Sequence, residues 1–97
     1  MAKAYIVFIK EETLDASELA QYKSMVGHSF EGHEVEFLAT YGEQEVLEDA
    51  DAQGVVILGF AHMAAARAWY HSEAYQRARD HRFKGARYRT ILVEGRA

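Results

Sequence analysis

A stripe of aromatic and basic residues in the C-terminal third is the part of the sequence best suited to holding a ligand. Four residues recur at positions i, i+3, i+4 and i+7 and would share one face of a helix: Tyr75, Ala78, Arg79 and Arg82. A long cation beside a tyrosine, with small alanines nearby, can form a recess for an acidic molecule. In the alternative interpretation, Arg82 lays its stem over a sheet and its guanidinium on helix carbonyls or on Glu48. The sequence leaves both interpretations open.

Two side chains are candidate catalytic residues because they could transfer protons. Glu48 ends a short segment with an extended pattern, and a carboxylate held near apolar walls can serve as a proton shuttle. His28 lies near the end of the first expected helix, where the negative end of the helix dipole stabilises a cation. Most glutamates in such positions simply face water, so a solvent-exposed Glu48 is the alternative.

Two further aromatic residues join Tyr75 and Arg82 as candidate ligand-binding residues. Tyr22 lies on the apolar stripe of the first expected helix, and its hydroxyl needs a partner if the ring is buried. Trp69 is a large aromatic residue, and such residues usually supply buried area in a core or a dimer contact. A place in the core is therefore the alternative for both.

Five histidines suggest a metal site, but their spacing argues against one. The segment from His33 to Phe37 begins like HExxH but has Phe37 where the second histidine is required. The chain has no cysteine, which excludes thiolate-based zinc and iron–sulfur sites. It also lacks a glycine-rich phosphate loop and a nucleophile-elbow serine. We expect no metal and no flavin, nicotinamide or nucleotide cofactor.

Length and composition indicate one small domain spanning residues 1–97. Apolar residues make up 49% and charged residues 27% of the chain, a balance typical of soluble globular proteins. The net charge of −4 is uneven, because residues 67–97 hold eight basic and three acidic side chains. Such a basic segment could contact nucleic acid, but no recognition motif accompanies it. We expect these charges to be neutralised within the protein, and we predict no nucleic-acid partner.

The apolar periodicity predicts the order βαββαβ, with an antiparallel sheet and helices on one face, which is the ferredoxin-like α+β arrangement. Asp15, followed by Glu18, resembles a capping box that opens the first helix, and Ser72 is the expected cap of the last one. A helix break is therefore expected near Tyr70 and His71. The expected strands are 4–9, 35–40, 55–60 and 88–93, with a short extended piece at 45–47; the expected helices run from Asp15 towards Gly32, over 61–70, and from Ser72 to about Phe83.

Two of these strands predict a partner. The runs 4–9 and 55–60 are continuously apolar, although a strand covered on one face should alternate apolar and polar residues. No spare helix is available for the second face, so we expect a homodimer that packs sheet to sheet. The longest apolar run is too short to cross a bilayer, and no signal peptide is visible, so we expect no membrane contact and a cytoplasmic location.

The segment from Ala65 to Gln76 (AARAWYHSEAYQ), followed by Arg82, resembles the signature of the domain-of-unknown-function family 1330. Residues 45–48, 55–60 and 93–95 are similar to that family's central hairpin, third strand and closing strand. The resemblance implies a dimeric α/β barrel, in the superfamily of small monooxygenases, muconolactone isomerases and dehydrochlorinases, with no settled activity. The chain departs from the family in lacking a proline in the first helix and in the turn sequence EGHE at 31–34.

The sequence patterns, together with the dimeric α/β barrel that the resemblance implies, predict a dimeric protein that binds a small acidic or aromatic molecule between sheet and helices. If the protein is an enzyme, cofactor-independent isomerase or lyase chemistry suits the available groups. The alternative is a non-catalytic binding or structural module, in which the fold serves to form the dimer. In either case Arg82 and Tyr75 are expected to point into a pocket that Tyr22 and Glu48 also reach.

Overall fold

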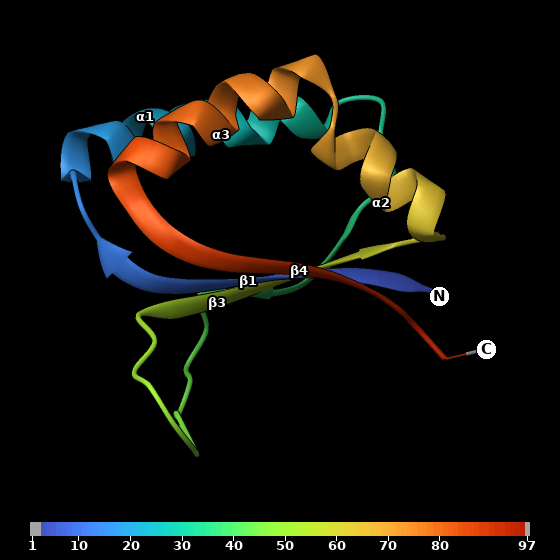
Figure 1. The fold of residues 1–97 in the computed structure, drawn as a ribbon. Coiled ribbons are helices and arrows are strands. Elements are labelled where there is room, and N and C mark those ends of the chain that lie inside the picture. The colour runs from blue at the N-terminus through green and yellow to red at the C-terminus, as the bar shows by residue number, and fades with distance from the viewer. Residues whose placement is uncertain (1–2, 97) are drawn as a thin grey trace.

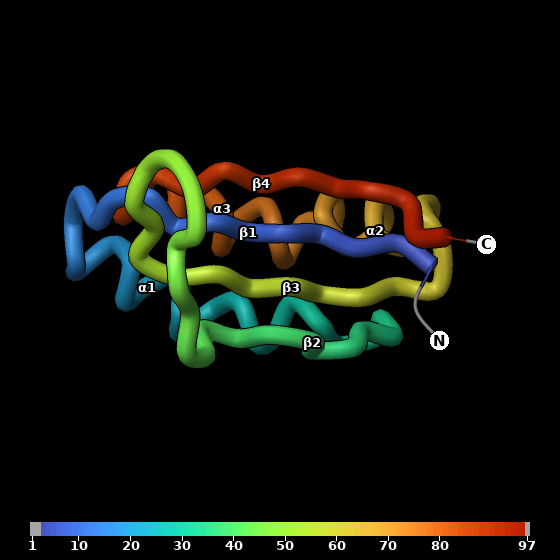
Figure 2. The backbone as a smooth tube through the Cα atoms, turned by 90° about the horizontal axis from the view of Figure 1, so that it is seen from below, coloured from blue at the N-terminus to red at the C-terminus, as the bar shows by residue number. Residues whose placement is uncertain are grey.

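A four-stranded antiparallel sheet carries all the helices on one of its faces (Figure 1). The computed structural model describes residues 3–96. The sheet has the strand order β2-β3-β1-β4, which Figure 2 shows from the uncovered side. The elements in chain order are β1 (Ala4–Thr13), α1 (Ala16–Val26), the 3₁₀ turn η1 (Gly27–Phe30), β2 (Glu36–Thr40), β3 (Gly54–Phe60), α2 (Met63–Tyr70), α3 (Glu73–Gly85) and β4 (Ala86–Glu94). The predicted ferredoxin-like α+β fold is confirmed.

The start of α1 confirms one capping prediction and corrects a detail of it. The Asp15 carboxylate accepts hydrogen bonds from the backbone N–H groups of Ser17 and Glu18. The reciprocal half of a capping box is not formed, because the Asp15 N–H donates to the carbonyl of Gly85. The Glu18 carboxylate instead lies 2.6 Å from Nδ1 of His81, and this contact ties α1 to α3.

The predicted break before the last helix is also confirmed. The chain changes direction between α2 and α3, as Figure 1 shows. Ser72 has extended backbone angles, and its hydroxyl accepts a hydrogen bond from the Tyr75 N–H at 3.3 Å while donating to the Trp69 carbonyl at 2.7 Å. One serine therefore ends the first helix and begins the second.

The short extended piece expected at residues 45–47 is not a strand. The chain from 41 to 53 forms a loop that projects from the sheet on the side away from the helices (Figure 1). Tyr41 and Asp49 have positive φ angles of 54° and 72°, and these turns lead the chain away from the edge of the sheet. Leu47 is 83% exposed. Three residues would gain too few ladder hydrogen bonds to offset the cost of ordering them.

Helices α1 and α3 approach closely at Gly85. A Cβ atom at this position would lie 2.5 Å from the backbone nitrogen of Leu19. The Gly85 carbonyl also accepts hydrogen bonds from the N–H groups of Leu14 and Asp15. Glycine at the end of α3 thus allows direct contact between the two helix backbones.

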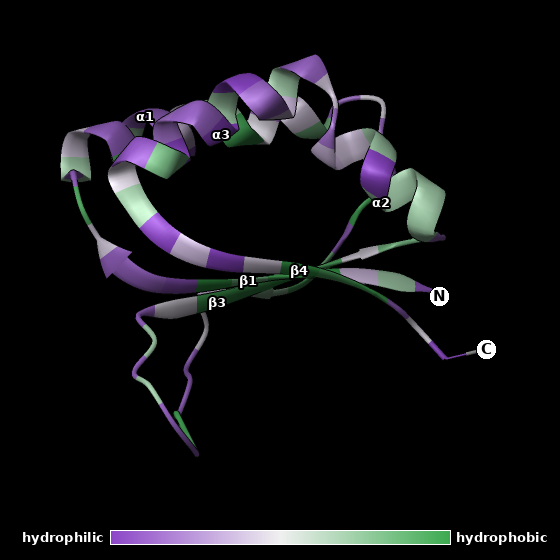
Figure 3. Ribbon diagram, viewed as in Figure 1, coloured by the Kyte–Doolittle hydropathy of each residue, from purple (hydrophilic) through white to green (hydrophobic). Residues whose placement is uncertain are grey.

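The core between helices and sheet is built largely from aromatic rings. Trp69 and Tyr75 are fully buried, and their ring centroids lie 4.1 Å apart. From the sheet side, Ile6, Phe8 and Phe60 complete this layer. Figure 3 shows the corresponding apolar colouring on the strands. These large rings make up most of the contact between the helices and the sheet.

The second face of the sheet is also apolar, as the continuous runs in the sequence predict. In β1, Ala4, Ile6 and Phe8 are buried beneath the helices, while Val7 and Ile9 are only half-buried on the opposite face. Other apolar residues are paired with them in register on that face: Val55, Ile57 and Ile91. The helices leave this face uncovered.

Candidate functional site

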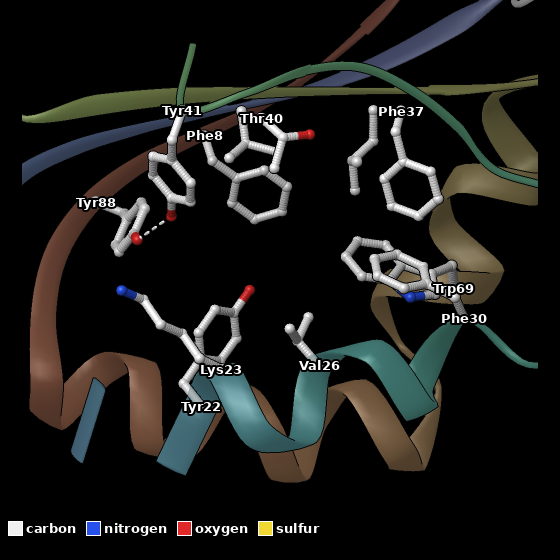
Figure 4. Close-up of a pocket in the computed structure, with 12 residues that line it drawn as sticks. Phe8, Tyr22, Lys23, Val26, Phe30, Phe37, Thr40, Tyr41, Trp69 and Tyr88 are labelled. Carbon is white, nitrogen blue, oxygen red and sulfur yellow. Dashed lines mark hydrogen bonds between the residues drawn. The ribbon is translucent and has the colours of Figure 1, made fainter. Parts of the chain in front are cut away.

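A cavity of about 120 Å³ lies between the sheet and α1 (Figure 4). Its walls are almost entirely apolar or aromatic, which is typical of sites for small organic molecules. The lining residues come from the sheet (Phe8, Phe37, Thr40, Val56, Leu58 and Tyr88), from the turn after β2 (Tyr41), from α1 and η1 (Tyr22, Lys23, Val26 and Phe30) and from α2 (Trp69).

One end of the cavity is closed by stacked rings. Phe30 lies nearly parallel to Trp69, with an interplanar angle of 8° and a centroid distance of 5.1 Å. Phe37 contacts Phe30 edge to face at 5.0 Å. The indole N–H of Trp69 donates to the hydroxyl of Ser29 at 3.1 Å, so the wall has no unsatisfied donor there. This end can accept only apolar groups.

The opposite end of the cavity carries hydroxyl groups and an amine. The Tyr22 hydroxyl is directed into the cavity and lies 3.3 Å from the hydroxyl of Tyr75. Tyr41 and Tyr88 share a hydrogen bond between their hydroxyls. Figure 4 shows the exposed Lys23 side chain on the same side as these hydroxyls, away from the stacked rings. The site is therefore polar at one end and apolar at the other.

Arg82 places a buried positive charge behind this polar end. The residue is 2% exposed, and its guanidinium carbon lies 5.0 Å from the ring centroid of Tyr88, 5.7 Å from Phe8 and 6.0 Å from Tyr22. All three rings line the cavity. Within residues 3–96, Arg82 forms no ion pair, and its Nε has no hydrogen-bond partner. The π faces of aromatic rings and the neighbouring Tyr75 hydroxyl partly compensate its charge.

Burial determines the protonation state of the tyrosines around the cavity. Desolvation raises the pKa of Tyr22, Tyr75 and Tyr88 above the ordinary value of 10.0, and the charge of Arg82 opposes this shift. The three hydroxyls are therefore neutral at physiological pH and can donate hydrogen bonds. A hydroxyl that donates beside a buried cation stabilises an anionic oxygen.

Four of the predicted site residues come together at this cavity. Tyr22 and Trp69 line it. Tyr75 and Arg82, which were expected to point into the pocket, are not among its lining residues: Tyr75 contacts Tyr22 and Trp69, and Arg82 lies behind the Tyr22 ring. This grouping follows from the helical stripe of α3, which faces the sheet because Ala78 and Tyr75 are fully buried.

The two predicted catalytic residues lie elsewhere. Glu48 is in the projecting loop and borders a hollow on the far face of the sheet, together with Val7 and Ile9. The expected convergence of Glu48 with Arg82 within one chain is therefore wrong, because the sheet separates them. His28 is exposed on η1, where its Nδ1 lies 3.3 Å from the carboxylate of Glu31. The 3₁₀ turn directs this imidazole into solvent.

Several cavity residues were not identified from the sequence. Lys23 directly follows Tyr22 in the sequence, and this adjacency places it close to the site. Tyr88 faces the helices because it lies two residues from buried Ala86 on β4. The position of Tyr41 depends on its positive φ angle and on Gly54, where a Cβ atom would come within 2.5 Å of the Tyr41 ring. No sequence signal predicts that combination.

Within the described residues, no group of three or more histidine, aspartate or glutamate side chains could hold a metal ion. Over the same part of the chain, no helix has the length and apolar character needed to span a membrane.

Residues 3–96 match the family described as a domain of unknown function, DUF1330. No curated protein matches the chain. The solved structures similar to this one include a protein of unknown function, RPA0582, from Rhodopseudomonas palustris, with a TM-score of 0.76 and 17% identity over 99% of this chain and 84% of that one. The cofactor-independent oxygenase SnoaB from Streptomyces nogalater has a TM-score of 0.66 and 10% identity, over 100% of this chain and 96% of that one. At these identities the likeness concerns the fold alone.

Proposed function

The chain belongs to the DUF1330 family, and from that premise we propose that it binds a small single-ring aromatic acid in the cavity between the sheet and α1. The observation that carries the proposal is Arg82, a buried cation without a carboxylate partner in the described chain, directly behind an aromatic cavity. The stacked rings at one end suit a planar ring, and the hydroxyls at the other suit an acidic group.

The size of the cavity supports a ligand with one ring. An apolar cavity of roughly 150 Å³ holds a benzene molecule. The present cavity of about 120 Å³ is similar, and its open polar end gives room for a substituent. A fused two-ring compound would have to displace Phe30 or Phe37.

The charge of the site supports an anionic substituent. An unpaired buried charge costs several kcal/mol; the aromatic rings around Arg82 offset most of this cost, and an anionic ligand would offset the remainder. The Tyr22 hydroxyl would contact the anion directly. The Tyr75 hydroxyl, which lies 3.3 Å from that of Tyr22, would hold the Tyr22 hydroxyl in position. Lys23 at the mouth would attract the acid from solvent.

Two functions are compatible with such a ligand. The first is cofactor-independent chemistry of the isomerase or lyase type, in which Tyr22 and Arg82 stabilise an enolate or phenolate oxygen. The similar fold of SnoaB, a cofactor-independent oxygenase, is compatible with a reaction that needs no cofactor. The second is a non-catalytic binding module. In the described chain no carboxylate or imidazole lines the cavity, and this observation favours binding without proton transfer.

We also propose that a second copy of the chain covers the far face of the sheet. The apolar residues of β1, β3 and β4 on that face support this dimer, as does Val93, which is 49% exposed. Light scattering at micromolar concentration should then give twice the chain mass of 11.0 kDa. A stable folded monomer would contradict the proposal.

Thermal unfolding with added ligands tests the binding proposal. Benzoate and 4-hydroxybenzoate should raise the melting temperature, while benzyl alcohol, which keeps the ring but has no charge, should have a smaller effect. At a concentration of 100 Kd, a ligand adds about 2.7 kcal/mol to the free energy of unfolding. Val26→Phe fills the cavity from α1 and should abolish the shift, whereas Leu14→Phe, at an exposed position before α1, should preserve it. Equal shifts in both variants would contradict the proposal.

A further inference from the structure

A second cavity, of about 270 Å³, lies between α2 and the edge strand β4. It shares no lining residue with the cavity beneath α1. Its walls combine basic, hydroxyl and apolar side chains: Ile6, Arg67, Tyr70, His71, Thr90 and Leu92. This mixture differs from the aromatic lining of the first cavity and indicates a different ligand.

Arg67 of α2 and His71, the residue that caps the C-terminus of α2, border this cavity. Arg67 and His71 are four residues apart and therefore lie on one side of the helix. Neither forms an ion pair within residues 3–96. Glu73, the acidic residue in the first turn of α3, is paired with Arg77. The negative end of the α2 dipole disfavours an anion here, and the Arg67 charge offsets it.

Two buried polar atoms near the cavity have no hydrogen-bond partner within the described chain. One is the hydroxyl oxygen of Thr90, which lines the cavity from β4. The other is Nε of Arg79, whose guanidinium lies over the Tyr70 ring at 5.6 Å and over Phe83 at 4.7 Å. Buried polar groups are normally satisfied, so an unpartnered hydroxyl in a cavity indicates a missing partner.

The remaining walls are apolar. Ile6 is 2% exposed and forms the floor, with the half-buried Leu92 beside it. A ligand complementary to this lining has an anionic group to pair with Arg67, a hydrogen-bond acceptor for the Thr90 hydroxyl, and a short hydrocarbon chain to pack against Ile6 and Leu92. The guanidinium of arginine matches the two oxygens of a carboxylate.

We propose that this cavity binds a short-chain aliphatic carboxylate, independently of the aromatic acid proposed for the first cavity. The carboxylate lies against Arg67 and accepts a hydrogen bond from the Thr90 hydroxyl. The hydrocarbon chain lies on Ile6 and Leu92, under the ring of Tyr70.

Calorimetry and methyl NMR with hexanoate test the proposal, with hexanol and inorganic phosphate as comparison compounds. Hexanoate should bind and should shift the methyl signals of Ile6 and Leu92. Hexanol lacks the charge and phosphate lacks the chain, so each should bind at least about tenfold more weakly. No binding of hexanoate, equal binding of either comparison compound, or shifts confined to Val56 and Leu58 of the first cavity would overturn the proposal.

Substitutions distinguish hexanoate binding at this cavity from a nonspecific attraction of anions to the basic surface of the protein. Arg67→Gln should weaken hexanoate binding by about tenfold or more, while Arg77→Gln, which removes an exposed arginine of α3, should leave it unchanged. Thr90→Val should leave the melting temperature of the free protein unchanged or raise it, because the buried hydroxyl has no partner there, yet it should weaken hexanoate binding. Equal affinity for hexanoate in the wild type, Arg67→Gln and Thr90→Val would overturn the proposal.

Discussion

Replacing Arg82 by methionine tests how a buried cation is tolerated beside the first cavity. Methionine keeps much of the apolar stem but removes the charge. Four aromatic centroids lie 5.0–6.0 Å from the guanidinium carbon, and each such contact contributes about 0.5–2 kcal/mol. Burial of an ion costs several kcal/mol and opposes that gain. The two effects nearly cancel, so Arg82→Met should change the free energy of unfolding by no more than about 1 kcal/mol.

Urea denaturation of the wild type and of Arg82→Met, each with and without benzoate, measures this effect. In the free protein the two curves should nearly coincide, whereas the stabilisation by benzoate should be lost in the variant. Arg77→Met, which removes an exposed arginine of the same helix, is the matched control and should keep the response to benzoate. A loss of about 3–5 kcal/mol in free Arg82→Met would refute the reasoning, because a loss of this size indicates a carboxylate left without its partner.

Three further predictions concern the remaining features of the fold. Because the pKa of Tyr22 is raised in the folded protein, its contribution to the free energy of unfolding is fully present below pH 10 and decreases as the pH rises above 10, where this tyrosine ionises first in the unfolded chain. Tyr22→Phe should therefore make the decline of this free energy at alkaline pH, measured by urea denaturation, shallower. Ser72→Ala should cost about 0.5–2 kcal/mol by loss of the α3 cap, while Ser24→Ala, on the exposed face of α1, should cost less; equal losses in chemical denaturation would argue against the cap. Gly85→Ala should cost about 1–3 kcal/mol because its Cβ would meet the α1 backbone, whereas Gly27→Ala, with open space around it, should be neutral or stabilising; the reverse order of melting temperatures would contradict the packing described here.

Local signals were sufficient to predict most of the fold. Asp15 and Ser72 act on backbone groups within three residues, so their roles as caps follow from sequence spacing alone. The structure differs from the prediction where contacts between residues far apart in the sequence determine the local structure. Glu18 pairs with His81 across two helices instead of completing a capping box, and residues 45–47 find no neighbouring strand in the described chain.

The candidate site could be predicted only in part, for a related reason. The stripe of α3 and the inner face of α1 identify Tyr75, Arg82 and Tyr22, because helical periodicity determines which side chains face the sheet. Glu48 was misplaced because nothing local determines on which side of the sheet a long loop will lie. Tyr41 reaches the cavity through an unusual φ angle, and this depends on tertiary packing.

Methyl NMR of the wild-type protein titrated with benzoate tests the central proposal most directly. Val26, Val56 and Leu58 line the first cavity from opposite sides and report its occupation. In the wild type we predict that benzoate shifts the methyl signals of all three residues in a saturable manner. In Val26→Phe, benzoate should no longer shift the signals of Val56 and Leu58. Unchanged signals at Val56 and Leu58 at saturating benzoate would contradict the proposal that this cavity binds an aromatic acid.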